Sequence, residues 1–277
     1  MANKKNVFIH PSSIVENPKA IGENTYIGPY CIIGKDVIIG KNNKFHSHVT
    51  IDGHTKIGDH NEVYPYASLG LPPQDIKYKN EPTELIIGNY NVLREHVTIH
   101  RATTHDKAVT RVGNNCFLMV GIHIAHDCEI GDHSILANNV VLGGHVSLGN
   151  NAIIGGLTAI HQFVRIGSYA MIGGVSAAGE DIPPFAMAYN NASSRSAKIM
   201  GTNMIGMKRN GFSREDIKSI NQSFEVLYKS GAETVKERLV SLKNEKQLHT
   251  SAFDIFITFM SQPSKRGLCA GESQKYG

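Results

Sequence analysis

Through most of the first two thirds of the chain every sixth residue is apolar, and no other feature restricts the fold so strongly. The series starts at Ile9 and steps by six without exception to Leu69. It resumes at Ile87 and, after a slip in phase, runs from Val112 to Ile172. A period of six fits neither an α-helix nor a simple strand. It predicts a prism in which each hexad forms a short strand on one of three flat faces, so that three hexads complete a coil.

The apolar residue of each hexad is predicted to point into the prism and to stack on its counterpart one coil away. Composition agrees, because the chain has no Trp and only 7% aromatic residues, so its core must be aliphatic. Each buried Val, Ile or Leu contributes about 1.5–3 kcal/mol, and this ladder should supply most of the stability. Gly often follows the apolar residue, as in Ile27-Gly28 and Ile130-Gly131, and we expect it to let the backbone turn each corner.

Two excursions interrupt the coils, at residues 72–84 and 103–109, and are predicted to be loops. The repeats stop near Gly179. Beyond Pro183-Pro184, a capping box at residues 213–216 predicts a helix, and residues 252–259 predict another. The fold class expected is an all-β solenoid, a parallel β-helix over residues 1–189, with a smaller C-terminal α-helical domain over residues 190–277.

Composition limits the partners and the compartment. No apolar run approaches the roughly 20 residues that span a bilayer, and the N-terminal residues do not read as a signal peptide, so no membrane insertion is expected. Four scattered cysteines favour the cytoplasm. The net charge of +4 suits anionic substrates or an acidic partner, but no dense basic stripe predicts nucleic-acid binding.

The densest group of histidines lies in three successive coils. With 18 residues per coil, His126, Gly144 and Gln162 fall in one column, and Asp127, His145 and Phe163 fall in the next. His126 is therefore expected to face a glycine whose backbone N–H is unshielded. A base beside an accessible N–H donor is the minimum arrangement for acyl transfer. The simpler alternative is that these are solvated surface histidines.

Several strings in the sequence resemble the UDP-N-acetylglucosamine O-acyltransferase family of hexapeptide-repeat transferases. They are Ile124-Ala125-His126-Asp127-Cys128, Gly144-His145-Val146, Gly155–Phe163, Pro73–Tyr78, Val97–Arg101 and Lys208–Glu215. The similarity runs from about Ile9 to Gly267. It implies a left-handed winding, a homotrimer with active sites between subunits, and the first committed step of lipid A synthesis.

The resemblance also implies roles for individual residues. His126 would be the general base that activates the glucosamine 3-hydroxyl, Asp75 would orient and polarise His126, and the Gly144 amide would form the oxyanion hole. The sugar, diphosphate and acyl path would be lined by Gln74, His100, His123, His145, His161 and Gln162. Asn203 and Arg209 would reach the nucleotide. The donor would be an (R)-3-hydroxyacyl thioester on acyl carrier protein, and no metal or bound cofactor would be needed.

The chain departs from the family pattern in the region that follows the repeats. Relatives carry Asn-x-Glu-Gly where this chain has Asn203-Met204-Ile205-Gly206, and Asn210 replaces the second of two basic residues. The acidic nucleotide contact is therefore missing.

Glycines on successive coils form a further candidate site. Gly155 and Gly173 share one column, and Gly156 and Gly174 share the next. Because paired glycines leave a trough without side-chain walls, Gly156, Gly173 and Gly174 are predicted to form an acyl groove. The alternative is that they only let the backbone turn.

Other readings of the sequence stay open at this point. A γ-carbonic-anhydrase-like trimer would hold zinc through three histidines at an interface, but the three-residue spacing of His123 and His126 differs from the five in that family. An N-acyltransferase of the same pathway and a non-enzymatic scaffold are further alternatives. Neither the acyl chain length nor the choice between a 3-hydroxyl and a 3-amino acceptor follows from the sequence.

Overall fold

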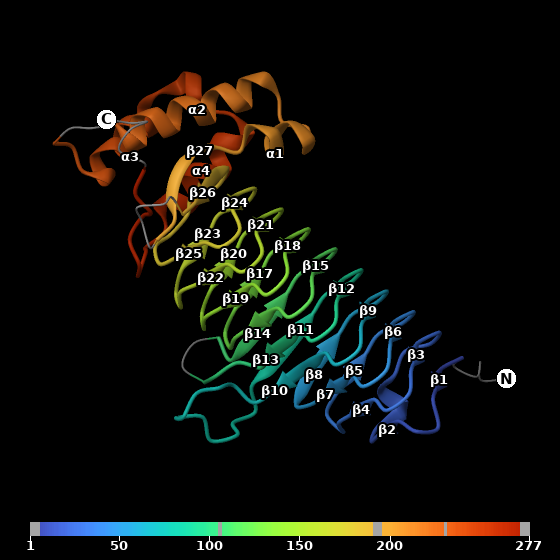
Figure 1. Ribbon diagram of the computed structural model, residues 1–277. Helices are drawn as coiled ribbons and strands as arrows, with labels where there is room; N and C mark the ends of the chain where they lie inside the picture. Colours follow the sequence, from blue (N-terminus) through green and yellow to red (C-terminus); the bar gives the residue numbers. More distant parts are fainter. Residues whose placement is uncertain (1–5, 105–106, 191–195, 230–231, 272–277) are drawn as a thin grey trace.

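The repeats form a three-sided prism that carries a group of helices at its C-terminal end (Figure 1). This computed structural model describes residues 6–104, 107–190, 196–229 and 232–271. Parts of both domains predicted from the sequence, and residues 105–106 of the second predicted loop, therefore lie outside the described residues.

Each face of the prism is one sheet, and all strand pairs within the coils are parallel. The first sheet consists of β1 (Phe8–Ile9), β3 (Tyr26–Ile27), β6 (Lys44–Phe45), β9 (Glu62–Val63), β12 (Val92–Leu93), β15 (Phe117–Leu118), β18 (Ile135–Leu136), β21 (Ile153–Ile154), β24 (Met171–Ile172), β26 (Ala186–Tyr189) and β27 (Lys198–Thr202). The second consists of β2 (Ile14–Val15), β4 (Ile32–Ile33), β7 (Thr50–Ile51), β10 (Ser68–Leu71), β13 (Thr98–His100), β16 (His123–Ile124), β19 (Val141–Leu142), β22 (Ala159–Ile160) and β25 (Ala177–Ala178). The third consists of β5 (Ile38–Ile39), β8 (His54–Ile57), β11 (Glu84–Ile87), β14 (Val109–Val112), β17 (Glu129–Ile130), β20 (Ser147–Leu148) and β23 (Arg165–Ile166).

Register between coils follows the period expected from the sequence. Ile135 pairs with Ile153, and Ile153 pairs with Met171. The 72–84 excursion leaves the prism between β10 and β11 (Figure 1). It does not disturb the stack, since Val63 before the excursion still pairs with Leu93 after it.

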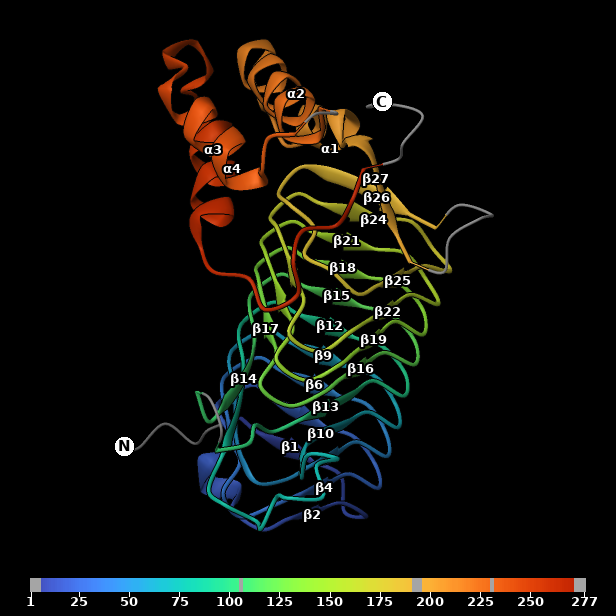
Figure 2. The ribbon, with the colours of Figure 1, turned by 90° about the vertical axis from the view of Figure 1, so that its left-hand side faces the viewer.

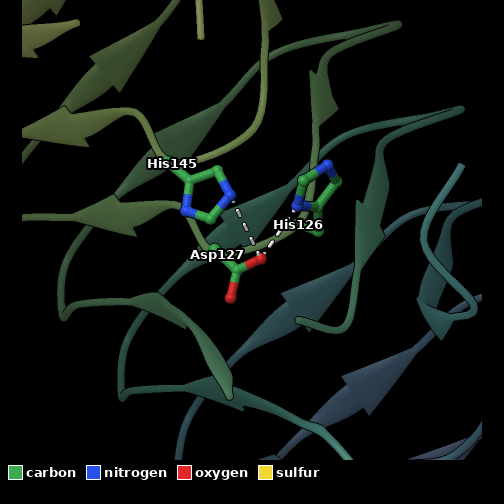
Figure 3. Close-up of side chains that lie close together, drawn as sticks. All are labelled: His126, Asp127 and His145. Carbon is green, nitrogen blue, oxygen red and sulfur yellow. Dashed lines mark hydrogen bonds and ion pairs between the residues drawn. The ribbon is translucent and has the colours of Figure 1, made fainter. Parts of the chain in front are cut away.

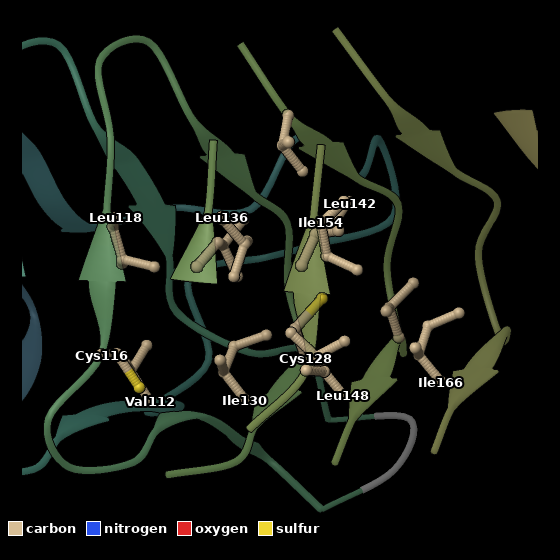
Figure 4. Packing of buried hydrophobic residues seen from close by; sticks show 14 of the residues in the cluster. Val112, Cys116, Leu118, Cys128, Ile130, Leu136, Leu142, Leu148, Ile154 and Ile166 are labelled. Carbon is tan, nitrogen blue, oxygen red and sulfur yellow. The ribbon is translucent and has the colours of Figure 1, made fainter. Parts of the chain in front are cut away.

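The interior of the prism is the predicted aliphatic ladder. In a typical strand of two residues the second side chain points inward, and Leu118, Leu136, Leu142 and Ile154 are all fully buried (Figure 4). Burial of each such side chain contributes about 1.5–3 kcal/mol, so the ladder holds successive coils together.

The corners differ from the sequence prediction. Apart from Gly70, which has a φ of 76°, the glycines that follow the inward residues do not supply the left-handed backbone. The positive φ angles at the corners occur mostly at residues such as Tyr30, His48 and Asp127. Gly is needed for close stacking of coils: a Cβ on Gly40 would lie 2.6 Å from the Gly58 carbonyl oxygen. Strain at the left-handed positions is offset in part by ring stacking along the corner, as between His48 and Tyr66 at 5.0 Å.

After the coils, the chain covers the end of the prism (Figures 1 and 2). Strand β27 pairs antiparallel with β26 and so extends the first sheet past residue 190. The helices are α1 (Met204–Arg209), α2 (Arg214–Tyr228), α3 (Val235–Asn244) and α4 (Ser251–Ser261), with short 3-10 turns at Pro18–Ala20 and Lys246–Leu248. Both helix predictions are confirmed, including the capping box of Ser213 and Asp216. The domain boundary after residue 189 stays a prediction.

An ion pair helps to attach these helices to the coils. The Arg165 guanidinium lies 2.8 Å from the buried Asp181 carboxylate and also donates to the carbonyl of Phe259 in α4. None of the described helices is long and apolar enough to cross a membrane.

Candidate active site

His126 and Asp127 lie at the corner that follows β16, and they form the centre of the site (Figure 3). Adjacent side chains in a strand point to opposite faces. At this corner Asp127 has a left-handed backbone with φ of 59°, and the two side chains meet. The His126 Nδ1 atom lies 2.8 Å from Asp127 Oδ2. An N–H at Nδ1 that donates to the carboxylate leaves Nε2 as the basic nitrogen of the neutral ring.

Asp127 is a buried carboxylate held in its charged form. Its side chain is 1% exposed, whereas that of His126 is 16% exposed. Burial alone would raise the pKa of Asp127, but hydrogen bonds from His126 and Thr103 outweigh it and hold the pKa below its ordinary value. A charged Asp127 at neutral pH can stabilise the imidazolium that forms when His126 accepts a proton.

His145 lies one coil further along, as the column prediction required. Its Nε2 atom is 3.7 Å from Asp127 Oδ2, and its ring is 5.2 Å from the His126 ring between centroids. Phe163, on the next coil, stacks on His145 at 4.4 Å. The predicted column of Asp127, His145 and Phe163 is therefore confirmed.

Gly144 lies directly against the His126 imidazole. A Cβ on Gly144 would be 2.5 Å from Cε1 and 2.7 Å from Nε2 of His126, so any other residue here would force the imidazole to move. The Gly144 N–H donates to no acceptor in the part of the chain that the structure describes. A basic nitrogen and an available backbone donor thus lie close together, which is the arrangement expected for acyl transfer.

Two further histidines lie on the second sheet beside this pair. Burial, with smaller contributions from His123 and His126, lowers the pKa of His100 to about 4. Burial also lowers the pKa of His123, whose Nδ1 lies 2.8 Å from the Thr98 hydroxyl. A neutral ring on both residues provides hydrogen-bonding groups without repelling a positive charge on His126.

The 72–84 loop carries Gln74 and Asp75, and among the described residues no hydrogen bond joins either of them to His126. Asp75 Oδ1 accepts a hydrogen bond from the backbone N–H of Lys77, and no hydrogen bond or ion pair links it to His126 among the described residues. Within this chain the carboxylate that contacts His126 is that of Asp127. The orienting role of Asp75 stays a prediction. Gln74 is exposed.

The remaining predicted site residues lie at the edge of the site or in α1. His161 and Gln162 are exposed on the coil after His145. Asn203 caps α1: its side chain accepts from the Gly206 N–H and donates to the Tyr169 carbonyl. Arg209 is exposed in the last turn of that helix. The structure thus gives Asn203 a structural role, and nucleotide binding by Asn203 and Arg209 stays a prediction.

The acyl-groove glycines lie at the corner between the first and second sheets. A Cβ on Gly173 would lie 2.8 Å from the Cβ of Tyr189, so packing already accounts for this glycine. Gly156 and Gly174 are less enclosed, with one carbonyl oxygen each at 3.1 Å from the added Cβ. Leu157 and Val175, which directly follow them, are 62% and 69% exposed. An apolar surface therefore borders this pair of glycines.

His126, Asp127 and His145 also qualify as a group that could ligate a metal ion, since their ligand atoms lie within 4.8 Å of one another. Ligation through Nδ1 of His126 would replace its hydrogen bond to Asp127. The close pairing of base and carboxylate favours proton transfer instead.

Comparison with known proteins identifies the family. A model described as "Udp N-acetylglucosamine O-acyltransferase; Domain 2" matches residues 181–269, and one of bacterial transferase hexapeptide repeats matches residues 19–53 and 110–144. A relative from Paraburkholderia phymatum, named acyl-[acyl-carrier-protein]–UDP-N-acetylglucosamine O-acyltransferase, is 50% identical over 223 residues, which are 80% of this chain and 84% of the relative. The chain belongs to the UDP-N-acetylglucosamine O-acyltransferase family.

Solved structures of family members agree over nearly the full length. UDP-N-acetylglucosamine O-acyltransferase from Moraxella catarrhalis is 42% identical, with a TM-score of 0.87 over 94% of this chain and 99% of that one. LpxA from Acinetobacter baumannii is also 42% identical, with a TM-score of 0.84 over 96% of this chain and 98% of that one. The protein is an acyltransferase, and the predicted left-handed β-helix of hexapeptide repeats is confirmed.

Proposed function

We propose that the protein moves an (R)-3-hydroxyacyl chain from acyl carrier protein to the 3-hydroxyl of UDP-N-acetylglucosamine, the first step of lipid A biosynthesis. The observation that carries the proposal is the His126–Asp127 pair at 2.8 Å, with Gly144 against the imidazole. The name of the Paraburkholderia relative supports both substrates.

In the proposed mechanism each group has one step. Nε2 of His126 takes the proton of the sugar hydroxyl as its oxygen attacks the thioester carbonyl carbon, and the Gly144 N–H stabilises the oxyanion that forms. The tetrahedral intermediate then collapses, the C–S bond breaks, and the proton on His126 passes to the departing thiolate. Asp127 stays charged and stabilises the imidazolium. A base of this kind contributes about 10²–10⁴-fold to the rate.

Product analysis tests the proposal directly. The purified protein would be incubated with hydroxyacyl carrier protein and with either UDP-N-acetylglucosamine or its 3-amino analogue, and the products weighed by mass spectrometry. We expect an ester on the 3-oxygen of the first sugar. Formation of an amide alone would move the assignment to the amino-sugar, and absence of any acylated product would refute the proposed function.

The proposal includes a cytoplasmic homotrimer with active sites between subunits. The second sheet supports it, because the neighbouring residues Ile14 and Ile32 on its outer side are 60% and 50% exposed, and Val141 on the same side is 45% exposed. Exposed apolar side chains on a flat face are typical of contact surfaces. Light scattering of the purified protein measures the assembly state.

Activity is expected to be independent of metal ions. Because His126 donates through Nδ1 to Asp127, the proposed chemistry needs only a proton acceptor and backbone dipoles. Treatment with a chelator should leave kcat unchanged. Stoichiometric zinc in the purified protein, lost together with activity on chelation, would instead favour a metalloenzyme.

Gly174→Met is expected to shift donor preference toward shorter hydroxyacyl chains. The proposed groove runs along Gly156 and Gly174 beside exposed Leu157 and Val175, and a Met side chain would fill its distal part. Each excluded methylene loses about 0.8 kcal/mol of burial, so a few carbons decide the preference. Competition between short and long hydroxyacyl carrier-protein donors measures the ratio. An unchanged ratio in a folded variant would mean that these glycines serve only the stacking of coils.

A further inference from the structure

The residues at the two ends of the 103–109 excursion, Thr103 and Thr110, both form hydrogen bonds with Asp127. Thr103, where the chain leaves the coil, lies against the Asp127 carboxylate, and Thr110, where the chain rejoins it in β14, lies against the Asp127 backbone. Both threonines are buried, at 2% and 0% exposure. The chain thus leaves the regular coil next to Asp127, the residue that binds the His126 ring. This position points to a role in the site in addition to linking two strands.

The contacts of Thr103 converge on one oxygen. Its hydroxyl donates to Asp127 Oδ2 at 2.7 Å, and its backbone N–H donates to the same atom at 3.1 Å. Oδ2 is also the atom that accepts from His126 Nδ1 at 2.8 Å. Oδ1 is buried and has no hydrogen-bond partner among the described residues. The carboxylate is therefore fixed through the oxygen that faces the base.

Thr110 fixes the backbone of the same residue. Its hydroxyl oxygen accepts a hydrogen bond from the Asp127 N–H at 2.9 Å. Asp127 adopts the left-handed conformation, which costs free energy in a residue with a side chain. The two threonines thus hold Asp127 at both its side chain and its main chain, in the conformation that brings its carboxylate to His126.

We propose that Thr103 is a positioning residue for acyl transfer: it fixes the Asp127 carboxylate, which in turn fixes the His126 imidazole toward the acceptor hydroxyl. This inference rests on the proposed function. A buried carboxylate is stable only with donors, and Thr103 supplies two of them. Its hydroxyl and amide are among the groups that keep the pKa of Asp127 low against the effect of burial.

Other titratable groups face the pair from neighbouring coils. His145 lies 3.7 Å from Asp127 Oδ2, and His100 and His123 lie on the side of His126. Cys128, directly after Asp127, stays protonated because burial raises its pKa to about 12. Loss of the Thr103 hydroxyl leaves more negative charge on the Asp127 carboxylate. The carboxylate then binds a proton more readily, and it also stabilises the positively charged His126 ring more strongly. Both effects move the acidic limb of the rate profile to higher pH.

The test compares Thr103→Val with Thr103→Ser in the full-length protein. Valine keeps the shape of threonine but removes the donor, and a lost hydrogen bond to a charged group corresponds to a fall of about 10- to 100-fold in kcat. We expect an unchanged KM for the UDP-sugar, an acidic limb shifted upward, and recovery toward the parent kcat in Thr103→Ser. Thr25→Val is the matched control, since Thr25 is buried on a distant coil, where its hydroxyl donates to the Gly40 carbonyl and accepts from the Asn43 N–H.

Two results would overturn the inference while leaving the proposed function intact. One is a Thr103→Val protein with parental kcat and pH profile; the other is equal loss of kcat in Thr103→Val and Thr25→Val, which would indicate general destabilisation. If Thr103→Val does not fold, Thr103→Ser against Thr103→Ala decides, and equal kcat in those two refutes the role of the hydroxyl. An inactive parent protein would refute the proposed function instead.

Discussion

His126→Ala is expected to lower kcat by about 10²–10⁴-fold while leaving KM for the UDP-sugar nearly unchanged. The imidazole is the proton acceptor in the transition state, and its Nε2 lies beside Gly144 in the site. Steady-state rates with a saturating hydroxyacyl donor measure the effect.

His133→Ala is the control for this experiment. His133 is an exposed histidine at another corner of the same coil, where its backbone N–H donates to the Asn114 carbonyl. Because this variant removes a corner histidine without touching the Asp127 pair, it should keep the parental kcat. Equal activity of the two variants would exclude His126 as the base.

Asp127→Asn is expected to lower kcat by a similar factor, about 10²–10⁴-fold, because an amide leaves the imidazolium without a compensating charge and permits the wrong tautomer of His126. The burial of Asp127, with a side chain 1% exposed, means that water cannot replace the lost charge. Rates across a range of pH, measured together with KM, separate this effect from a loss of binding.

Two further carboxylates make the Asp127 experiment specific. Asp132→Asn is the matched control, since Asp132 accepts hydrogen bonds from Asn114 in a ladder between coils and lies outside the site. Asp75→Asn tests the competing hypothesis, in which Asp75 orients His126 as the sequence predicts. A larger loss of kcat in Asp75→Asn than in Asp127→Asn would support that prediction.

The coil could be predicted from sequence because its physics is periodic. An inward aliphatic residue every six positions determines the faces, the register and the columns, so the stacking of His145 on Phe163 and of His126 on Gly144 followed from counting alone. The function of the corner glycines did not follow. Only the distance between stacked coils shows that a Cβ on Gly40 would strike the Gly58 carbonyl.

The carboxylate partner of His126 was missed for a related reason. Neighbouring residues in a strand point to opposite faces, so contact between His126 and Asp127 does not follow from their adjacency in sequence. The positive φ of Asp127 brings the two side chains together. A repeat of apolar residues in the sequence contains no information about this backbone angle. A signal was nevertheless present, since Asp127 shares a column with His145 and Phe163. The role of Thr103 depends on a loop path that has no period at all.

The antiparallel strand β27 has a consequence for how the molecule ends. A stack of parallel coils exposes at its last coil a row of backbone groups that matches the start of another stack, and open edges of this kind promote end-to-end association. Strand β27 pairs antiparallel with β26 and so reverses the strand direction at this edge. The coil of another molecule therefore cannot add to this sheet with the parallel hydrogen-bonding pattern of the stack. The helices that follow lie across the same end. Deletion of the segment from β27 onward should therefore produce fibres that grow along the axis of the prism.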